Sequence, residues 1–246
     1  MSLIEFERVG DVAIIALNRP ERMNALGSEI LSELREAYRE LADDASLRVG
    51  VITGRGRAFT AGRDIKEGAQ TGELARQATT ANLDLFMENN SPKPLVSAVN
   101  GYAGGAGFYL ATRAVDFVVA GASAVFQIAE VPRGIMHGWQ TGYWAGLSRA
   151  AARELAFGFK ISGRRAYDMG LANAYAEDAD LMDTALSAAR HLAAMPATVI
   201  EANRQFLKRL DPVIDENLAA EAKGVYRALL ATQGAGDAEF LAAKKG

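Results

Sequence analysis

The stretch that most constrains the fold is residues 94–116, which read PLVSAVNGYAGGAGFYLATRAVD. Its apolar run at 95–99 ends at Asn100-Gly101, a pattern typical of a buried strand that enters a turn. Four small residues at 104–107 follow, and residues 108–114 have a composition that suits a helix. The pattern predicts a strand-to-helix corner at which a ligand can approach the backbone closely.

The first N–H groups of a helix at such a corner have no acceptor within the helix and lie at the positive end of its dipole. They are therefore suited to holding negative charge, although tight packing of the turn explains such glycines equally well. The glycine spacing matches neither the G-x-x-x-x-G-K-[ST] phosphate-binding motif nor a clean G-x-G-x-x-G dinucleotide motif. The corner thus lacks a nucleotide fingerprint.

Composition excludes several classes of protein. The 246 residues, half of them hydrophobic, suffice for one large core or two modest ones. With 27 basic and 30 acidic residues, and no basic stripe, we expect no nucleic-acid partner. The absence of cysteine excludes disulfide scaffolds, thiol catalysis and cysteine-ligated metals. The two histidines, His137 and His191, lack a spaced cluster of partners, so no metal site is expected.

The distribution of apolar residues along the chain does not indicate a membrane protein. The first eight residues, MSLIEFER, lack the basic and apolar regions of a signal peptide, and no apolar run reaches the length of a membrane span. We therefore expect a cytoplasmic protein with no membrane partner.

Apolar periodicity, turn residues and caps predict the other elements. Residues 4–8 and 12–18 are predicted strands joined in a hairpin at Gly10-Asp11, and Ser28 is the expected N-cap of the following helix. The remaining predicted elements are a helix with apolar positions from Ile30 to Leu41, a strand at 49–53, a helix at 74–87, a strand at 116–120, a loop after Phe126, and helices at 143–157, 198–210 and 216–230.

Alternation of strands and helices predicts an α/β fold with a mainly parallel sheet and right-handed crossovers. Strand signals cease after the strand at 116–120, so only helices are expected from residue 143 onward. The best boundary is at Met195-Pro196, which divides the chain into a core at 1–195 and a helical region at 196–246. The apolar faces of the last helices need a partner, which can be another subunit.

A second glycine-rich loop strengthens the inference from the first. The predicted strand at 49–53 opens into residues 54–64, GRGRAFTAGRD. Each loop follows a parallel strand and can offer a backbone N–H group. Two converging N–H donors form an oxyanion hole, which stabilises negative charge that develops on a carbonyl oxygen.

At this point the sequence resembles the crotonases, the enoyl-CoA hydratase/isomerase superfamily, from about Ile4 to about Lys208. The matching segments are LNRPERMNAL at 17–26, VITGRGRAFTAGRDIKE at 51–67, KPLVSAVNGYAGGAG at 93–107, DFVVA at 116–120 and ISGRRAYDMGL at 161–171. The resemblance implies a spiral core of ββα turns, with a C-terminal helical region that builds homotrimers, often stacked as hexamers. It implies an acyl-CoA substrate, with CoA as part of the substrate and no separate cofactor.

The resemblance also implies roles for individual residues. Ala61 and Ala106 take the positions of the two oxyanion N–H donors, Glu130 takes the position of a catalytic glutamate, and His137 is a candidate second acid/base beside it. The expected substrate-binding residues are Gly62, Arg63, Asp64, Gly105, Gly107, Tyr109 and Gly138, the expected CoA contacts are Arg22 and Ala25, and Trp139, Tyr143 and Trp144 are expected to line the core and acyl pocket. A structural or solvated role remains open for His137, Tyr109 and Arg22.

One departure from the family pattern favours a particular reaction. Hydratases of the family carry two carboxylates, but the first of these positions holds Tyr109 here. Residues 100–116 are one residue longer than the usual pattern, and the alternative placement shifts the donor to Gly107 and the acid position to Leu110, which restores no carboxylate. A single base suffices to move a double bond, whereas hydration uses two groups.

Isomerisation with Glu130 as the base is therefore favoured over hydration. The alternative enzymatic activities are other crotonase reactions, such as hydrolysis or decarboxylation of a CoA ester with the help of His137. A catalytically reduced CoA-binding scaffold protein is the alternative outside them. Some relatives are linked to RNA, but the net charge of −3 without a basic run argues against that role here.

Overall fold

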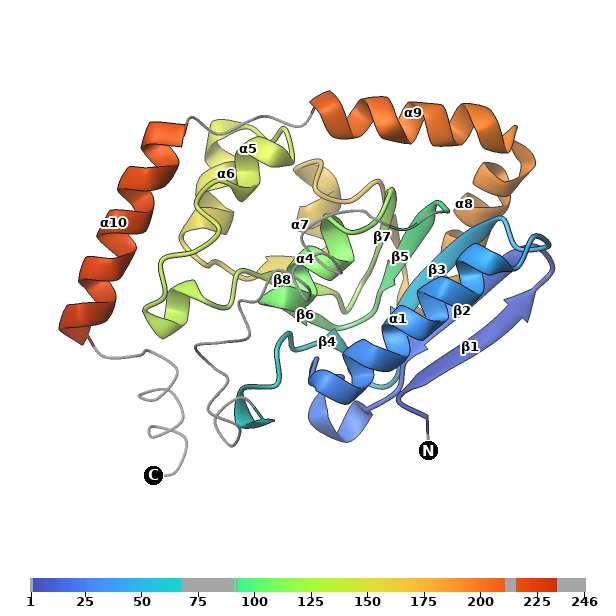
Figure 1. The fold of residues 1–246 in the computed structure, drawn as a ribbon, viewed down its shortest axis with the longest axis horizontal. Coiled ribbons are helices and arrows are strands. Elements are labelled where there is room, and N and C mark those ends of the chain that lie inside the picture. Colours follow the sequence, from blue (N-terminus) through green and yellow to red (C-terminus); the bar gives the residue numbers. More distant parts are fainter. Residues whose placement is uncertain (1, 68–90, 92, 211–215, 234–246) are drawn as a thin grey trace.

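The computed structural model describes residues 2–67, 91, 93–210 and 216–233, whose strands form two sheets (Figure 1). In spatial order the larger sheet contains β1 (Ile4–Val9), β2 (Val12–Leu17), β3 (Val49–Gly54), β5 (Leu95–Val99), β7 (Phe117–Gly121) and β10 (Ala174–Ala176). The smaller sheet contains β4 (Ala58–Thr60), β6 (Tyr102–Gly104), β8 (Val125–Gln127) and β9 (Ile161–Ser162).

Helices surround these sheets. The described α-helices are α1 (Ser28–Asp43), α4 (Ala106–Thr112), α5 (Thr141–Trp144), α6 (Arg149–Ala156), α7 (Gly163–Asp168), α8 (Leu181–Ala194), α9 (Ala197–Leu210) and α10 (Glu216–Gln233). Short 3-10 helices are η1 (Pro20–Arg22), η3 (Val131–Arg133) and η4 (Asp178–Asp180). The helix predicted at 74–87 lies outside the described residues.

A repeated pair of strands links the two sheets. β3, β5 and β7 are parallel neighbours in the larger sheet, and the strand that follows each of them, β4, β6 and β8, joins the smaller sheet, again in parallel order. The predicted hairpin is confirmed, since β1 pairs with β2 in antiparallel register from Ile4↔Leu17 to Val9↔Val12. The mixed α/β fold with mainly parallel pairing is therefore confirmed.

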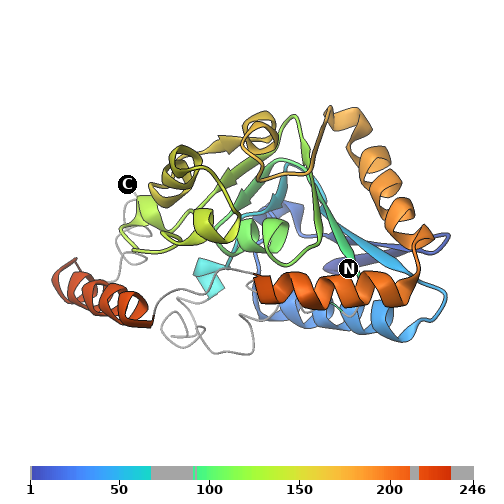
Figure 2. The same cartoon turned by 90° about the horizontal axis from the view of Figure 1, so that it is seen from above.

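Alternation along the strands assigns each side chain to one of two cores. In β2, Ile15 and Leu17 join the core that α1 and α4 cover, whereas Val12 joins the core on the opposite face. The second core is closed by α8, whose Ala185 and Ala189 are fully buried. Figure 2 shows α1 and α8 on opposite sides of the large sheet. Both faces are covered, which explains why β2, β3 and β5 consist of buried residues throughout.

Two predictions about elements were wrong. The N-cap of α1 is Gly27, and Ser28 is instead the first helical residue, with its N–H and hydroxyl both donating to Glu67. Strands do not cease after 120, because β9 and β10 complete the edges of the two sheets. The helical patterns predicted at 143–157 are confirmed, and they correspond to the two helices α5 and α6.

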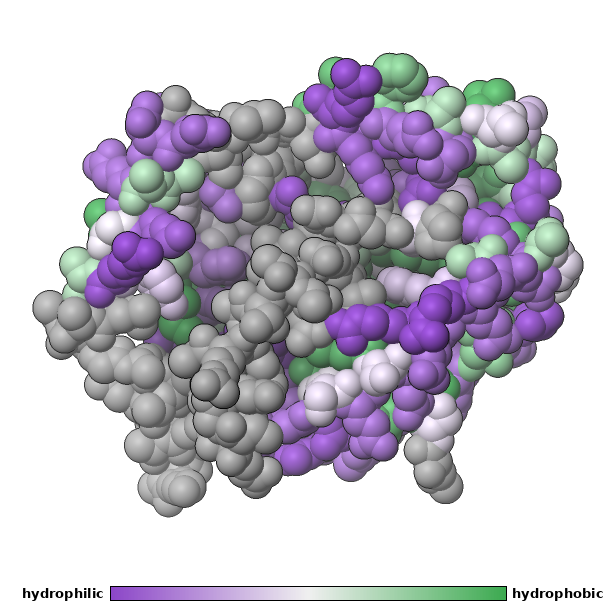
Figure 3. All heavy atoms as spheres, in the orientation of Figure 1, coloured by the Kyte–Doolittle hydropathy of each residue, from purple (hydrophilic) through white to green (hydrophobic). Residues whose placement is uncertain are grey.

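The two C-terminal helices lie at the edge of the molecule. Buried Arg204 fixes α9 to the core, since its Nε donates to Asp116 Oδ1 at 2.9 Å and its Nη2 to the carbonyl of Ser91 at 2.9 Å. α10 stands away from the sheets in both ribbon views (Figures 1 and 2). Val199, Phe206, Leu207 and Leu210 are the exposed large apolar residues of α9. Figure 3 shows apolar surface among hydrophilic side chains over this helix. The predicted helical C-terminal region is confirmed, while its role in trimers and the boundary at residue 195 stay predictions.

Candidate active site

The two glycine-rich loops leave the same edge of the smaller sheet. β4 and β6 are parallel, with Ala58 opposite Tyr102 and Thr60 opposite Ala103, so both strands end on one side. The loop at 61–64 follows β4, and Gly105 with the first turn of α4 follows β6. The carboxyl ends of neighbouring parallel strands therefore bring the loops together, as the sequence predicted.

Close backbone contact between the loops requires their glycines. A Cβ atom on Gly62 would lie 2.4 Å from the carbonyl oxygen of Gly104 and 3.0 Å from the nitrogen of Ala106. Gly62 also has a φ of +86°, a region that side chains other than glycine rarely adopt. A Cβ atom on Gly107 would lie 2.6 Å from the carbonyl oxygen of Thr60. The predicted residues Gly62, Ala106 and Gly107 are thus brought together at one place.

The two predicted oxyanion donors differ in this structure. Ala106 and Gly107 open α4, and no acceptor for either N–H group is found among the described residues. The N–H of Ala61, by contrast, donates to the carbonyl of Met23 at 2.9 Å. One donor position is therefore open to a ligand, and the other already has an acceptor within the chain.

Asn24 holds the segment that supplies this acceptor. Its fully buried amide nitrogen lies within 3.1 Å of the carbonyl oxygens of Arg55, Ala58 and Phe59. Met23 and Asn24 have φ values of 52° and 53°, the left-handed region in which asparagine is among the commoner residues. Asn24 was missed as a site-building residue, although its position in the matching segment 17–26 was a usable signal.

Glu130 lies at the entrance to α4. It immediately precedes η3, and its Oε1 lies 3.2 Å from the position that a Cβ atom on Gly105 would occupy. Its Oε2 is buried and has no hydrogen-bond partner within the described part of the chain. A buried carboxylate oxygen without a donor is costly, and it is an acceptor available to a ligand bound at Gly105.

The charge of Glu130 acts on the neighbouring side chains of Tyr102 and Arg133. Burial raises the pKa of Tyr102, and the Glu130 carboxylate raises it further. Burial lowers the pKa of Arg133, an effect that Glu130 opposes. The hydroxyl of Tyr102 donates to Gln127 Oε1 at 2.9 Å, so this phenol has a partner of its own. Glu130 is thus the carboxylate at the centre of a partly buried polar cluster.

Tyr109, the residue expected at the position of the missing carboxylate, lies one helical turn after Ala106 on α4. Burial raises the pKa of Tyr109, and the charge of Glu130 adds to the effect, while the hydrogen bond with Thr141 opposes it. The phenol is therefore neutral near pH 7 and is suited to donate a hydrogen bond rather than to act as a base. Its oxygen lies 3.3 Å from Thr141 Oγ1, a partner that no sequence signal indicated.

His137 and Gly138 lie beside Tyr109, as predicted for residues of one site. The rings of His137 and Tyr109 meet edge to face, with 5.6 Å between their centroids. A Cβ atom on Gly138 would lie 3.0 Å from the hydroxyl of Tyr109. Half-buried Trp139 follows, whereas the side chains of Tyr143 and Trp144 lie outside what the structure describes.

The other predicted contacts are less closely tied to this cluster. Asp64 is buried, pairs with Arg19 at 3.0 Å, and accepts from the N–H groups of Lys66 and Glu67. This carboxylate is therefore committed to the local fold. Half-buried Arg63 follows Gly62 directly, and its backbone pairs with that of Leu26 in an isolated bridge.

The two predicted CoA contacts lie at the surface side of the same segment. Arg22 is exposed on η1, and half-buried Ala25 follows three residues after it in the turn. Within the described residues, no three histidine, cysteine or acidic side chains are placed to hold a metal ion. None of the described helices is long and apolar enough to span a bilayer. These contacts, and the roles of all the site residues, stay predictions.

Comparison with known proteins agrees with this geometry. A family model described as enoyl-CoA hydratase/isomerase matches residues 7–236. The chain is 33% identical over 239 residues to the 2,3-dehydroadipyl-CoA hydratase of Escherichia coli, covering 95% of this chain and 92% of that protein. It is also 33% identical over 200 residues to the 1,2-epoxyphenylacetyl-CoA isomerase of Escherichia coli, covering 75% and 74% of the two chains.

Solved structures give the same result for the fold. The crystal structure of a carnitinyl-CoA hydratase from Mycobacterium avium superimposes with a TM-score of 0.79 at 29% identity, covering 97% of this chain and 93% of that one. The predicted crotonase-type fold is therefore confirmed. The chain belongs to the enoyl-CoA hydratase/isomerase family of the crotonase superfamily.

Proposed function

We propose that this crotonase-family enzyme moves the double bond of an enoyl-CoA between the 3,4 and 2,3 positions, with Glu130 as its single base. The observation that carries the proposal is the buried Oε2 of Glu130, which has no partner among the described residues and belongs to a carboxylate packed against Gly105. The second carboxylate position holds Tyr109, a phenol that burial keeps protonated. One base is sufficient for a proton shift between two carbons.

The reaction needs two proton transfers by the same carboxylate. Glu130 takes a proton from C2 of a 3-enoyl thioester, and the electron pair moves onto the thioester oxygen to form a dienolate. Glu130, now protonated, returns the proton to C4, and the electrons of the dienolate close the 2,3 double bond. Nothing is consumed in the cycle, so no cofactor is required beyond the CoA that is part of the substrate.

The dienolate oxygen is the group that the glycine-rich loops would hold. The N–H of Ala106 is open at the start of α4 and lies at the positive end of that helix. The N–H of Ala61 serves as the second donor once it exchanges the carbonyl of Met23 for the substrate oxygen. Each such donor contributes about 3 kcal/mol to stabilising the transition state.

The remaining contacts follow from the position of the loops. Gly62, Arg63, Gly105 and Gly107 surround the thioester, and Arg22 on exposed η1 pairs with CoA phosphate, next to Ala25. The two relatives from Escherichia coli are named for reactions of CoA thioesters, a hydration and an isomerisation. Their names support the acyl-CoA substrate and leave both reactions to be compared directly.

The test is a pair of rates measured on one enzyme preparation. A 3-enoyl-CoA and its 2-enoyl isomer of equal chain length are supplied in turn, and isomerised and hydrated products are separated by mass. We expect isomerisation to be the faster reaction. Hydration that is faster than isomerisation in the wild-type chain contradicts the proposal.

Hydration with His137 is the second candidate. The edge of the His137 ring lies against Tyr109, so an imidazole is available on the side of the site where the second carboxylate is missing. An imidazole has an ordinary pKa near 6.5 and suits proton transfer at neutral pH. In that case His137→Ala abolishes hydration and spares isomerisation. Hydration unaffected by the substitution excludes this role for His137.

A further inference from the structure

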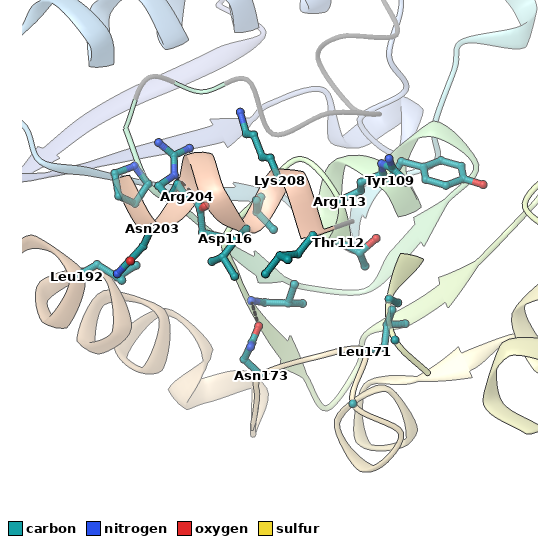
Figure 4. Close-up of a pocket in the computed structure, with 18 of the residues that line it drawn as sticks. Tyr109, Thr112, Arg113, Asp116, Leu171, Asn173, Leu192, Asn203, Arg204 and Lys208 are labelled. Carbon is teal, nitrogen blue, oxygen red and sulfur yellow. Dashed lines mark hydrogen bonds and ion pairs between the residues drawn. The ribbon is translucent and has the colours of Figure 1, made fainter. Parts of the chain in front are cut away.

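A cleft of about 750 Å³ lies next to the site, between α9 and the body of the protein (Figure 4). Its walls are largely apolar and include Val115, Leu171, Leu192, Ile200, Leu207 and Leu210. Neither Glu130 nor any residue of the two glycine-rich loops lines it. The cleft is therefore a space separate from the site at which Glu130 and Gly105 meet.

Of the residues that line the cleft, Tyr109 is the one that also lies close to the site, and Thr141 is its partner. Each lines the cleft, and Tyr109 lies one helical turn after Ala106 on α4, within the field of Glu130. Figure 4 shows Tyr109 at the end of the cleft opposite Leu192, with its phenol ring turned away from the side chains of α9. Tyr109, with its partner Thr141, therefore lies where the cleft comes nearest to the residues of the site.

The ring is held firmly in this position. Tyr109 is 2% exposed, and its oxygen lies 3.3 Å from Thr141 Oγ1. The Tyr109 ring meets Phe108 and His137 edge to face, with centroids 5.3 Å and 5.6 Å away. Gly138 approaches the hydroxyl so closely that a Cβ atom there would lie 3.0 Å from it. No side of the ring is left open for a chain to pass.

We propose that Tyr109, braced by Thr141, is a partition that closes the Glu130 site off from the apolar cleft and so restricts this enzyme to short acyl groups. The inference rests on the proposed function, because it assumes that the acyl chain of a CoA thioester lies at Glu130. A glutamate side chain at this position has no ring to close the wall. The substitution that removes the second carboxylate therefore also sets the depth of the acyl pocket.

The test uses a series of acyl chains with and without the partition. Dissociation constants of saturated acyl-CoA thioesters from four to twelve carbons are measured by calorimetry, and kcat/KM is measured on the matching 3-enoyl-CoA series. We expect wild-type affinity and kcat/KM to stop rising, or to fall, beyond the short chains. In Tyr109→Ala the cleft becomes accessible, and each added methylene group then increases affinity by about fourfold.

Three further variants separate a steric partition from other roles of Tyr109. Tyr109→Phe keeps the ring, so the preference for short chains persists even if its absolute rate changes. Ala145→Phe adds bulk inside the cleft next to Thr141, and in the Tyr109→Ala background it removes the gained preference for long chains. Ala145→Phe alone leaves the wild-type chain-length profile unchanged, because the wild-type acyl chain does not enter the cleft.

The outcomes distinguish this inference from the proposed function. Wild-type turnover that is as fast on twelve carbons as on four, or a Tyr109→Ala profile identical to the wild-type profile, overturns the partition and leaves the isomerase proposal intact. If Tyr109→Ala gains affinity for long acyl chains as expected, but neither protein turns over any enoyl-CoA, the result supports the partition and contradicts the isomerase proposal. Failure of every acyl-CoA to bind overturns both.

Discussion

Two buried side-chain oxygens, Glu130 Oε2 and the hydroxyl of Tyr38, meet no hydrogen-bond partner within the described residues. A buried polar atom without a partner lowers stability by about 1–3 kcal/mol, so each requires an explanation. Glu130 faces Gly105 and the loops of the site, whereas Tyr38 lies on α1 against the core. We therefore expect that substitution of Glu130 lowers turnover, whereas removal of the Tyr38 hydroxyl raises stability.

Glu130→Gln tests the first consequence. The amide keeps the size of the side chain but cannot accept the C2 proton, so turnover falls by about 100-fold or more. Acyl-CoA affinity changes by no more than a few-fold, because the expected oxyanion donors are backbone groups. The control is Glu29→Gln, which changes an exposed glutamate on α1 in the same way. Steady-state kinetics with wild-type turnover in Glu130→Gln would remove Glu130 from the mechanism.

Tyr38→Phe tests the second consequence. The substitution deletes only the unpartnered hydroxyl and keeps the ring that packs on the core, so the free energy of unfolding rises by about 1 kcal/mol. Denaturation in urea at pH 7 measures the change. The comparison is Tyr226→Phe, which removes the hydroxyl of a half-buried tyrosine on α10. A loss of stability in Tyr38→Phe would mean that the hydroxyl has a favourable partner in solution.

The same phenol predicts a dependence of stability on pH. Burial raises the pKa of Tyr38 in the folded chain above the ordinary value of about 10 in the unfolded chain. The folded state therefore binds the Tyr38 proton more tightly than the unfolded state does. The resulting contribution to the free energy of unfolding is complete below pH 10 and is lost as pH rises through the folded pKa. The slope is about 1.4 kcal/mol per pH unit for one phenol.

Urea denaturation between pH 8 and pH 11 measures this slope. The free energy of unfolding of the wild-type chain should fall above pH 10. In Tyr38→Phe the fall should be less steep, by the amount that one phenol contributes. Tyr109, whose pKa is also raised by burial, contributes the same trend in both chains. Equal slopes in the two chains would show that Tyr38 titrates normally.

At the scale of elements, one asparagine joins the segment after β2 to the segment around β4. The side-chain oxygen of Asn24 accepts from the N–H of Arg19 at 2.8 Å, and its amide nitrogen lies within 3.1 Å of three carbonyl oxygens. The backbone carbonyl of Asn24 accepts from the hydroxyl of Thr60 at 2.6 Å. This network places the carbonyl of Met23 at the N–H of Ala61. The position of the loop that begins at Ala61 therefore depends on Asn24, a side chain that is fully buried.

Asn24→Ala leaves several buried backbone groups without their partner, so we expect it to lower the free energy of unfolding by about 3 kcal/mol or more. Asn18→Ala, which loses a single 3.3 Å bond to the carbonyl of Ser2, should change stability by less than about 1 kcal/mol. Thermal and urea denaturation of both variants give the comparison. Similar stability of the two variants would show that the network is dispensable.

The elements with strong local patterns were predicted well. β5 and α9 lie within a residue of their expected bounds, because an apolar run between turn residues and an amphipathic repeat are local signals. β9 and β10 were missed because they are two and three residues long and acquire strand geometry only by pairing with β8 and β7. The smaller sheet as a whole depends on such short strands.

The candidate site also contains some features that local sequence patterns predict and others that they do not. The meeting of Gly62 with Ala106 follows from two glycine-rich loops after parallel strands, which the sequence displays. The bond from Ala61 to Met23 and the contact of Tyr109 with Thr141 join residues 38 and 32 positions apart, respectively, and no local pattern encodes them. Leu110, the alternative acid position, is fully buried in the core. Tyr109 is 2% exposed and belongs to the same core, so both placements put a buried residue of α4 at the acid position.

At the scale of the whole molecule, the two last helices differ in how they are held. α9 is anchored through Arg204, whose Nε and Nη2 bond to Asp116 and to the carbonyl of Ser91. α10 extends away from the body in both ribbon views. On α10, Leu218 is 48% exposed and Val225 is 46% exposed. Apolar surface on a projecting helix is typical of a segment that packs in an assembly.

The last prediction concerns that assembly, which the family resemblance implies to be a trimer or a pair of stacked trimers. Truncation after Met195 should abolish the assembly, but it also removes the Arg204 anchor, so point substitutions on α10 are the sharper test. Leu218→Asp with Val225→Asp places two charges on the apolar surface and should shift light-scattering mass toward the monomer. Lys223→Asp reverses a charge at an exposed polar position of the same helix and should leave the mass unchanged. A full-length chain that is a monodisperse monomer contradicts the prediction, because the exposed apolar residues of α10 then have no partner in another subunit.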